Sequence, residues 1–180
     1  MIDKTTTPRE ITFRVRRFNP DVDSAPHWSE YRLDVHDGMT VLEALHQLKA
    51  EQEPTLSWRS SCRMGVCGSC GMFINDLPQL ACQTQVLHLG TDVVSIAPLP
   101  NYDNVKDLVP DLAPLIEKHA AIKPYIIYLD QIEIDEPTGE FLQTPDQREE
   151  FSQFTHCIKC GLCLAACPTV ATDPLFLGPQ

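Results

Sequence analysis

The chain is 180 residues long, with 43% hydrophobic and 22% charged residues, which excludes a wholly disordered protein and allows one large domain or two small ones. Acidic residues outnumber basic ones 25 to 14, and the net charge of −11 disfavours nucleic acid as a partner. No apolar run approaches the roughly 20 residues of a membrane-spanning helix, and the first eight residues lack a signal-peptide core, so we expect no transmembrane segment and no secretion.

The first hundred residues predict a small mixed α/β fold. Alternating apolar and polar residues predict strands at 11–18 and 31–35. Thr40 predicts the start of a helix because Glu43 follows at the spacing of a capping box, and a single apolar stripe runs along the residues after it. Further short strands are predicted at 71–74, 80–83 and 93–98. We therefore expect a small mixed sheet packed on one helix.

The rest of the chain predicts mainly helix. Apolar residues at helical spacing predict a helix within 105–116, although Pro110 and Pro114 restrict where it can begin. Residues 129–142 predict an exposed loop. Thr144 then predicts the start of another helix, since proline and a capping-box glutamine follow it. The expected buried face of this helix consists of Phe151, Phe154 and Ile158.

Eight cysteines form two groups of four, separated by a long stretch without cysteine. This grouping supports a division into domains at residues 1–103 and 104–180. In a chain without export signals, such a number of cysteines indicates metal ligands before disulfides.

The first group has the spacing Cys62-x4-Cys67-x2-Cys70, and Cys82 follows after eleven intervening residues. Three thiolates on one loop and a fourth on a later strand are typical of plant-type ferredoxins, which bind a [2Fe–2S] cluster. The loop is rich in glycine, which allows backbone amides to turn toward an anionic cluster. Zinc ligands more commonly come as two Cys-x2–4-Cys pairs. The spacing therefore predicts a [2Fe–2S] site.

The second group, Cys157-x2-Cys160-x2-Cys163-x3-Cys167 followed by proline, is the bacterial-ferredoxin sequence for cubane-type clusters. The first three cysteines are spaced to occupy three corners of one cubane. Cys167 lies about one helical turn further on, and in two-cluster proteins this cysteine binds the neighbouring cluster.

The number of cysteines leaves these cubane sites incomplete. The cluster held by Cys157, Cys160 and Cys163 lacks a fourth thiolate, and the cluster that Cys167 would join has one ligand. Either Cys167 turns back to complete a single cubane, or the natural chain continues beyond Gln180. The apolar residues near the end favour the second alternative, because natural termini are usually polar.

At these motifs the chain resembles the iron–sulfur subunit of succinate dehydrogenase and fumarate reductase. The residues that carry the resemblance are Ser61–Gly71, Ala81-Cys82, Ile122–Tyr125, Cys157–Cys163 and Arg17–Asp23. The similarity extends over nearly the whole chain, and the order of the two cysteine motifs is specific.

The resemblance implies an α+β protein with an N-terminal β-grasp, plant-type ferredoxin-like domain, followed by an incomplete α-helical ferredoxin-like domain. It also implies three clusters in line. The [2Fe–2S] cluster would be held by Cys62, Cys67, Cys70 and Cys82. The [4Fe–4S] cluster would be held by Cys157, Cys160 and Cys163, and Cys167 would be one ligand of the [3Fe–4S] cluster. The remaining ligands are absent from this chain, which suggests a truncated C-terminus.

This resemblance implies an electron-transfer subunit of an oxidoreductase, with no catalytic substrate site of its own. Its partners would be an FAD-containing flavoprotein subunit, a membrane anchor and quinone, and it would lie at the cytoplasmic face of the membrane or its mitochondrial-matrix equivalent. Two alternatives remain open. One is an iron–sulfur subunit of another flavoprotein complex, such as a thiol-dependent fumarate reductase or a glycolate-oxidase-like complex. The other is a non-redox zinc or structural docking module.

Overall fold

The structure is a computed structural model that describes residues 8–125, 127–173 and 175–179. A five-stranded mixed sheet occupies the N-terminal part, with the strand order β2-β1-β5-β3-β4. The two central strands, β1 and β5, are parallel, and the other neighbouring pairs are antiparallel. The strands are β1 (Arg9–Arg17), β2 (His27–Val35), β3 (Gly71–Ile74), β4 (Leu77–Leu80) and β5 (Val93–Ala97).

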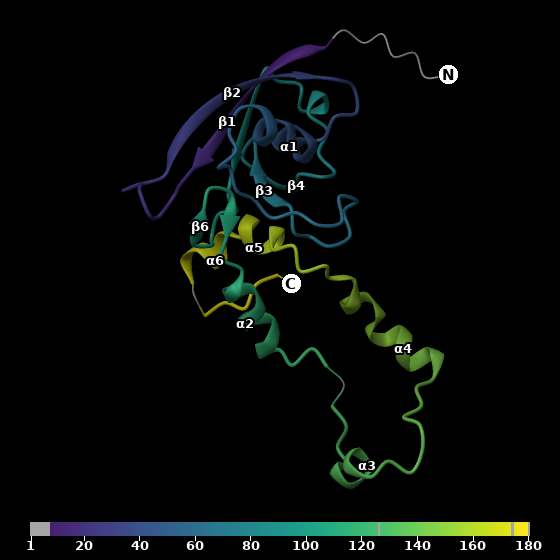
Figure 1. The fold of residues 1–180 in the computed structure, drawn as a ribbon. Helices are drawn as coiled ribbons and strands as arrows, with labels where there is room; N and C mark the ends of the chain where they lie inside the picture. Colours follow the sequence, from purple (N-terminus) through teal and green to yellow (C-terminus); the bar gives the residue numbers. More distant parts are fainter. Residues whose placement is uncertain (1–7, 126, 174, 180) are drawn as a thin grey trace, which may run out of the picture.

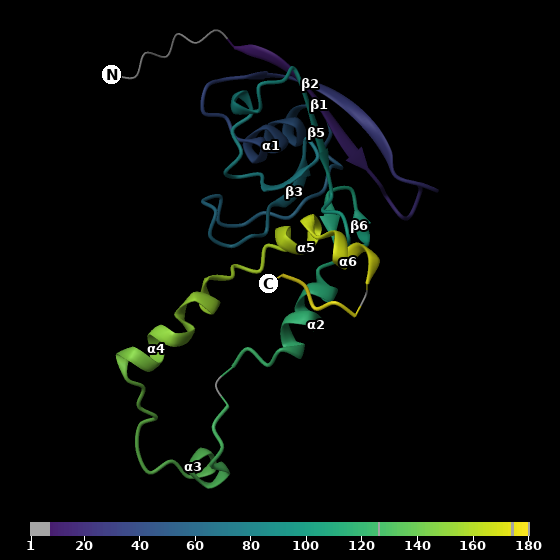
Figure 2. The same cartoon turned by 180° about the vertical axis from the view of Figure 1, so that it is seen from behind.

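Helix α1 (Val41–Glu51) lies against one face of this sheet (Figures 1 and 2). It begins as predicted, since the Thr40 hydroxyl accepts a hydrogen bond from the Glu43 amide at 3.1 Å and so satisfies one of the free amides of the first turn. Alternate residues of β1 are buried beneath it, and the apolar stripe of the helix completes the core. The predicted helix-on-sheet arrangement is therefore confirmed.

The strand predicted at 80–83 is shifted, because β4 ends at Leu80. A two-residue turn at Asn75 and Asp76, with φ values of +45° and +62°, joins β3 to β4 and pairs Ile74 with Leu77. Turn geometry of this kind sets the register of a hairpin. The residues after Leu80, including Cys82, form a turn instead of a strand.

The helix predicted within 105–116 begins only at Ala113. The first half of this range forms a small hairpin, β6 (Asn104–Lys106) and β7 (Val109–Pro110), before α2 (Ala113–Ala121). Asp107 has a φ of +45° at the turn of this hairpin. Pro110 has no backbone N–H to donate to a helical hydrogen bond, which prevents the helix from starting earlier.

Beyond α2 the chain forms an extended arm that projects away from the sheet and returns to it (Figures 1 and 2). The arm carries α3 (Gln131–Asp135) within the predicted exposed loop, and then α4 (Pro145–Ser152). Helix α4 has the predicted capping box, in which the Thr144 and Gln147 side chains each bond the other's backbone amide. After η2 (Gln153–His156), helices α5 (Leu162–Ala166) and α6 (Pro168–Thr172) lie beside the β6 hairpin.

The prediction that Phe151, Phe154 and Ile158 form a buried face is wrong. Their exposed fractions are 37%, 74% and 38%. The extended segment across from α4 contributes only a few side chains, including Tyr125, and leaves an open pocket of about 430 Å³ between them. Within the described part of the chain, none of the helices is long and apolar enough to cross a membrane.

Candidate metal centres

The first cysteine group lies at one end of the sheet. Cys70 immediately precedes β3, and Cys82 follows two residues after β4. The Ala81 amide donates to the Cys70 carbonyl at 3.0 Å, so the two cysteines lie at neighbouring ends of the β3–β4 hairpin, Cys70 just before β3 and Cys82 in the turn after β4. Both are buried, with exposed fractions of 3% and 6%.

The other two cysteines, Cys62 and Cys67, lie on the glycine-rich loop that precedes β3. The amides of Met64, Val66 and Cys67 point at the Cys62 sulfur at 3.5, 3.3 and 3.3 Å, and the Cys62 amide points at the Cys67 sulfur at 3.5 Å. Gly65, with a φ of +76°, permits this curvature. The loop therefore turns its amides toward sulfur, which stabilises negative charge there.

The four thiols form two chemically different pairs. Hydrogen bonds from Ser69, with others from the backbone and Cys62, lower the pKa of Cys67 to about 6. Burial, together with the neighbouring Cys82, raises the pKa of Cys70 to about 11. Cys62 and Cys67 are thus half-buried on a loop whose amides point at sulfur, whereas Cys70 and Cys82 are buried at the two ends of the β3–β4 hairpin.

A second pocket, of about 320 Å³, opens beside this group and is lined by Cys82, Arg63 and His46 among others. The His46 ring meets Trp58 edge to face, with centroids 5.0 Å apart, and its Nε2 atom is buried with no hydrogen-bond partner among the described residues. Burial, and then Arg63 and Lys49, lower the pKa of His46. In the sequence, no spacing to a carboxylate or a nucleophile distinguishes His46 from the other histidines. Trp58 packs against the core.

Asp107 holds the beginning of the cysteine loop, and sequence reasoning did not identify it. Its side chain is 1% exposed and accepts hydrogen bonds from Arg17 Nε at 2.8 Å and from the backbone amides of Ser57 at 2.9 Å and Phe18 at 3.1 Å. Burial acts to lower the pKa of Arg17, but hydrogen bonds to Asp107 and Tyr31 outweigh it and raise that pKa. Ser57 precedes the loop, so Asp107 ties the loop to β1.

The second group is more exposed than the first. Cys157 and Cys163 are exposed, and Cys160 is half-buried. Burial, followed by the charges of Cys160 and Cys157, raises the pKa of Cys163, so Cys157 and Cys160 both lie within electrostatic reach of Cys163. Cys167 lies at the far end of α5, where it precedes α6.

The two groups are neighbours in space although they are far apart in the sequence. Gly68, in the first loop, lies against the backbone of Cys160 in the second. The Tyr102 hydroxyl donates to the Gly161 carbonyl at 3.1 Å. Neither contact could be foreseen from the cysteine spacing alone.

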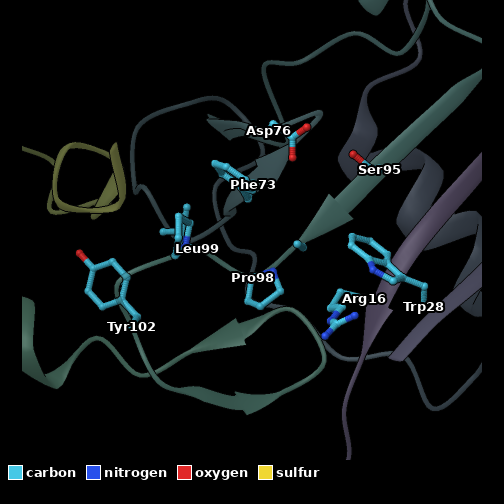
Figure 3. A pocket seen from close by; sticks show the side chains of 10 residues that line it. Arg16, Trp28, Phe73, Asp76, Ser95, Pro98, Leu99 and Tyr102 are labelled. Carbon is cyan, nitrogen blue, oxygen red and sulfur yellow. The ribbon is translucent and has the colours of Figure 1, made fainter. Parts of the chain in front are cut away.

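A third pocket, of about 370 Å³, lies on the sheet face away from α1 (Figure 3). Arg16 and Trp28 line one side of it and Tyr102 lies at the other. Arg14 and Arg16 stack over the Trp28 ring at 4.8 and 5.3 Å from its centre. Tyr102 thus belongs both to this pocket and to the contact with the second cysteine group.

The four cysteines of the first group suit the thiolate ligands of an iron–sulfur cluster. All eight cysteines are free thiols. Among the described residues, no three His, Cys, Asp or Glu side chains close around one point as they would around a single metal ion. A [2Fe–2S] cluster distributes four thiolates over two iron atoms, and the two thiol pairs of the first group, with amides directed at sulfur, suit that arrangement.

Residues 12–117 match the family described as a 2Fe-2S iron–sulfur cluster binding domain. The fold and the site thus define an iron–sulfur protein. The fumarate reductase iron–sulfur subunit of Haemophilus influenzae is 45% identical over 177 residues, which cover 94% of this chain and 69% of that protein. The mitochondrial succinate dehydrogenase [ubiquinone] iron–sulfur subunit of Candida glabrata is 40% identical over 178 residues, which cover 97% of this chain and 69% of that protein.

Among solved structures, a chain of the Mycobacterium smegmatis Sdh1 complex in the apo form aligns with a TM-score of 0.81 and 31% identity, covering 96% of this chain and 71% of that one. The chain belongs to the family of fumarate reductase and succinate dehydrogenase iron–sulfur subunits. It is an electron-transfer subunit of an oxidoreductase, and its cofactors are iron–sulfur clusters.

Proposed function

We propose that residues 1–103 form a β-grasp, plant-type ferredoxin-like domain that holds a [2Fe–2S] cluster through Cys62, Cys67, Cys70 and Cys82. The mixed sheet with parallel central strands and one covering helix supports this fold. The observation that carries the proposal is the set of four amide contacts to the Cys62 and Cys67 sulfurs, because amides directed at sulfur favour thiolate ligands of an anionic cluster.

Residues 104–180 form the N-terminal part of an α-helical ferredoxin-like domain in this proposal. Cys157, Cys160 and Cys163 hold three corners of a [4Fe–4S] cluster, and Cys167 is one ligand of a [3Fe–4S] cluster. The mutual electrostatic influence of the first three cysteines and the separate position of Cys167 after α5 support this division. The β6–β7 hairpin contacts the first unit through Leu108, which belongs to its core.

The complex proposed for this subunit follows from its relatives. A flavoprotein subunit with FAD lies on one side, and a membrane anchor with quinone lies on the other. The chain carries electrons between them as a peripheral subunit at the cytoplasmic face of the membrane, or at its mitochondrial-matrix equivalent. Membership of the fumarate reductase and succinate dehydrogenase family supports this arrangement over the other flavoprotein complexes and over a zinc module.

Anaerobic reconstitution with iron and sulfide tests the cluster assignment. We expect a reddish-brown chain with a dithionite-reducible rhombic EPR signal that is lost in Cys82→Ser and retained in the matched variant Cys157→Ser. A colourless protein that contains only zinc would contradict the proposal, as would an unchanged signal in Cys82→Ser.

Iron and sulfide analysis tests the second site. Because the fourth cubane ligand is absent from the eight cysteines, we expect about two irons per chain, with any cubane labile or absent. A content of about six or more irons per chain would show that a complete cubane assembles without that ligand.

A further inference from the structure

The two cysteine groups lie in close contact at Gly68. A Cβ atom built on Gly68 would lie 2.7 Å from both the Cα and the Cβ atoms of Cys160, and 3.0 Å from its backbone nitrogen. Cβ atoms in proteins essentially never approach other heavy atoms within 3.0 Å. Since the facing atoms belong largely to backbone, they cannot rotate out of the way as the end of a flexible side chain would.

Gly71 continues the same surface. A Cβ atom there would lie 3.1 Å from the Cys160 carbonyl oxygen and 3.2 Å from a methyl group of Leu162. Two glycines on either side of Cys70 therefore allow the second cysteine segment to lie directly on the first. A larger residue at Gly68 would separate them.

Two residues in the segment that follows β5, Asn101 and Tyr102, also hold the second cysteine segment. The Asn101 side-chain amide donates to the carbonyls of Leu164 at 2.9 Å and Cys167 at 3.2 Å, which supplies a donor to carbonyls at the end of α5. The Tyr102 hydroxyl bonds the Gly161 carbonyl at the start of the same helix, and Figure 3 shows this ring beside the short olive-coloured helix.

Helix α5 needs such contacts because it has only five residues, and a helix this short is not stable by itself in water. Its buried side chains are Leu164 and Ala165. The position of the second cysteine group is therefore determined by tertiary contacts with the first unit and not by local structure.

We propose that Gly68, Asn101 and Tyr102 are positioning residues that hold the second cysteine segment against the first loop and set the separation between the two groups. The role of that separation in electron transfer rests on the proposed function. The contact itself belongs to the polypeptide and can be measured without any cluster.

Amide hydrogen exchange of the full chain measures this contact, in the cluster-free and the reconstituted protein. The amides of Ala165 and Cys167 report on it, because they bond the carbonyls of Gly161 and Leu164 within α5. In Gly68→Ala we expect exchange at these two amides to become several-fold faster than in the wild type.

Gly65→Ala is the matched control, since Gly65 lies in the same loop with a similar positive φ of +76°, but its Cβ atom would meet only the side chain of Gln83. Exchange in α5 is expected to stay at the wild-type rate in this variant. Equal acceleration in Gly65→Ala and Gly68→Ala would overturn the proposal, because loop strain alone would then explain the effect.

Asn101→Gly provides a second variant should Gly68→Ala not fold. Asn101 has a φ of +65°, so glycine retains the backbone conformation and removes only the side-chain amide. We expect faster amide exchange in α5 in this variant too. Exchange at the wild-type rate in Asn101→Gly would refute the positioning role of Asn101. Failure of the proposed function would appear separately, as a missing [2Fe–2S] signal in the wild type.

Discussion

The two halves of this chain differ in how their cysteines are supported. The sheet and α1 enclose a continuous core that reaches Cys70 and Cys82. From the start of α2 onward, the buried apolar residues in the described part of the chain are Leu115, Leu164 and Ala165. The first cysteine group is thus part of a packed core, whereas few buried apolar side chains lie around the second.

The arm that carries α3 and α4 differs from the sheet domain in the same way, because its large apolar side chains are exposed. Leu129, Leu142 and Ile132 are 94%, 87% and 78% exposed, although the chain as a whole is acidic. These apolar side chains of the arm are thus left largely uncovered, in contrast to the packed core around α1.

The largest effect on stability is expected at Asp107, which joins the loop of the first group to β1. Asp107→Ala leaves the Arg17 guanidinium and two backbone amides without their buried acceptor, and should cost about 3–5 kcal/mol of unfolding free energy. Urea denaturation measures this. Asp92→Ala, which removes an exposed ion pair with Arg9, should cost below about 1 kcal/mol. Similar losses in both variants would contradict the assignment.

Two leucines compare the core with the arm. Leu45 is fully buried on α1 and Leu129 is 94% exposed on the arm. Leu45→Ala should lower the unfolding free energy by about 2–5 kcal/mol because it creates a cavity. Leu129→Ala should change it by less than about 0.5 kcal/mol in the isolated chain. A large loss in Leu129→Ala would show that the arm packs more tightly than this structure indicates.

The cap of α4 gives a smaller, local effect. Thr144→Ala removes a hydrogen bond to the Gln147 amide and should destabilise α4 by about 1 kcal/mol, seen as faster amide exchange in that helix. Because α4 lies on the arm, the global unfolding midpoint should not move. Thr144→Ser keeps the hydroxyl and serves as the control, and equal exchange in all three proteins would refute the role of the cap.

The smallest effect concerns pH. The folded-state pKa of His46 is lowered, chiefly by burial, so the unfolded chain binds a proton first as the pH falls. The contribution of His46 to stability is therefore fully present above its unfolded pKa of about 6.5 and decreases below it. We expect unfolding midpoints measured from pH 7 to pH 5 to fall less steeply in His46→Gln than in the wild type. The exposed His88 is the control site. An equal change of slope in His88→Gln would contradict the assignment of this pH dependence to His46.

Patterns of neighbouring residues in the sequence predicted those helices and strands that short-range interactions determine. β1 and α1 follow from side-chain periodicity, and the start of α4 follows from its capping box. The prediction was wrong where a turn decided the outcome. The register of β4 depends on the left-handed residues Asn75 and Asp76, and the hairpin around Asp107 replaces a predicted helix. The spacing of apolar residues does not predict the backbone conformation at such turns.

The sequence by itself determined the two cysteine groups, their order and the cluster types that their spacing suits, because ligand spacing is a property of the chain. Only the tertiary structure decided that Gly68 lies against Cys160 and that Asn101 holds the end of α5. It also placed Asp107 at the beginning of the first loop. These contacts join residues roughly 50 to 90 positions apart, and such pairs meet only when the core brings their elements together.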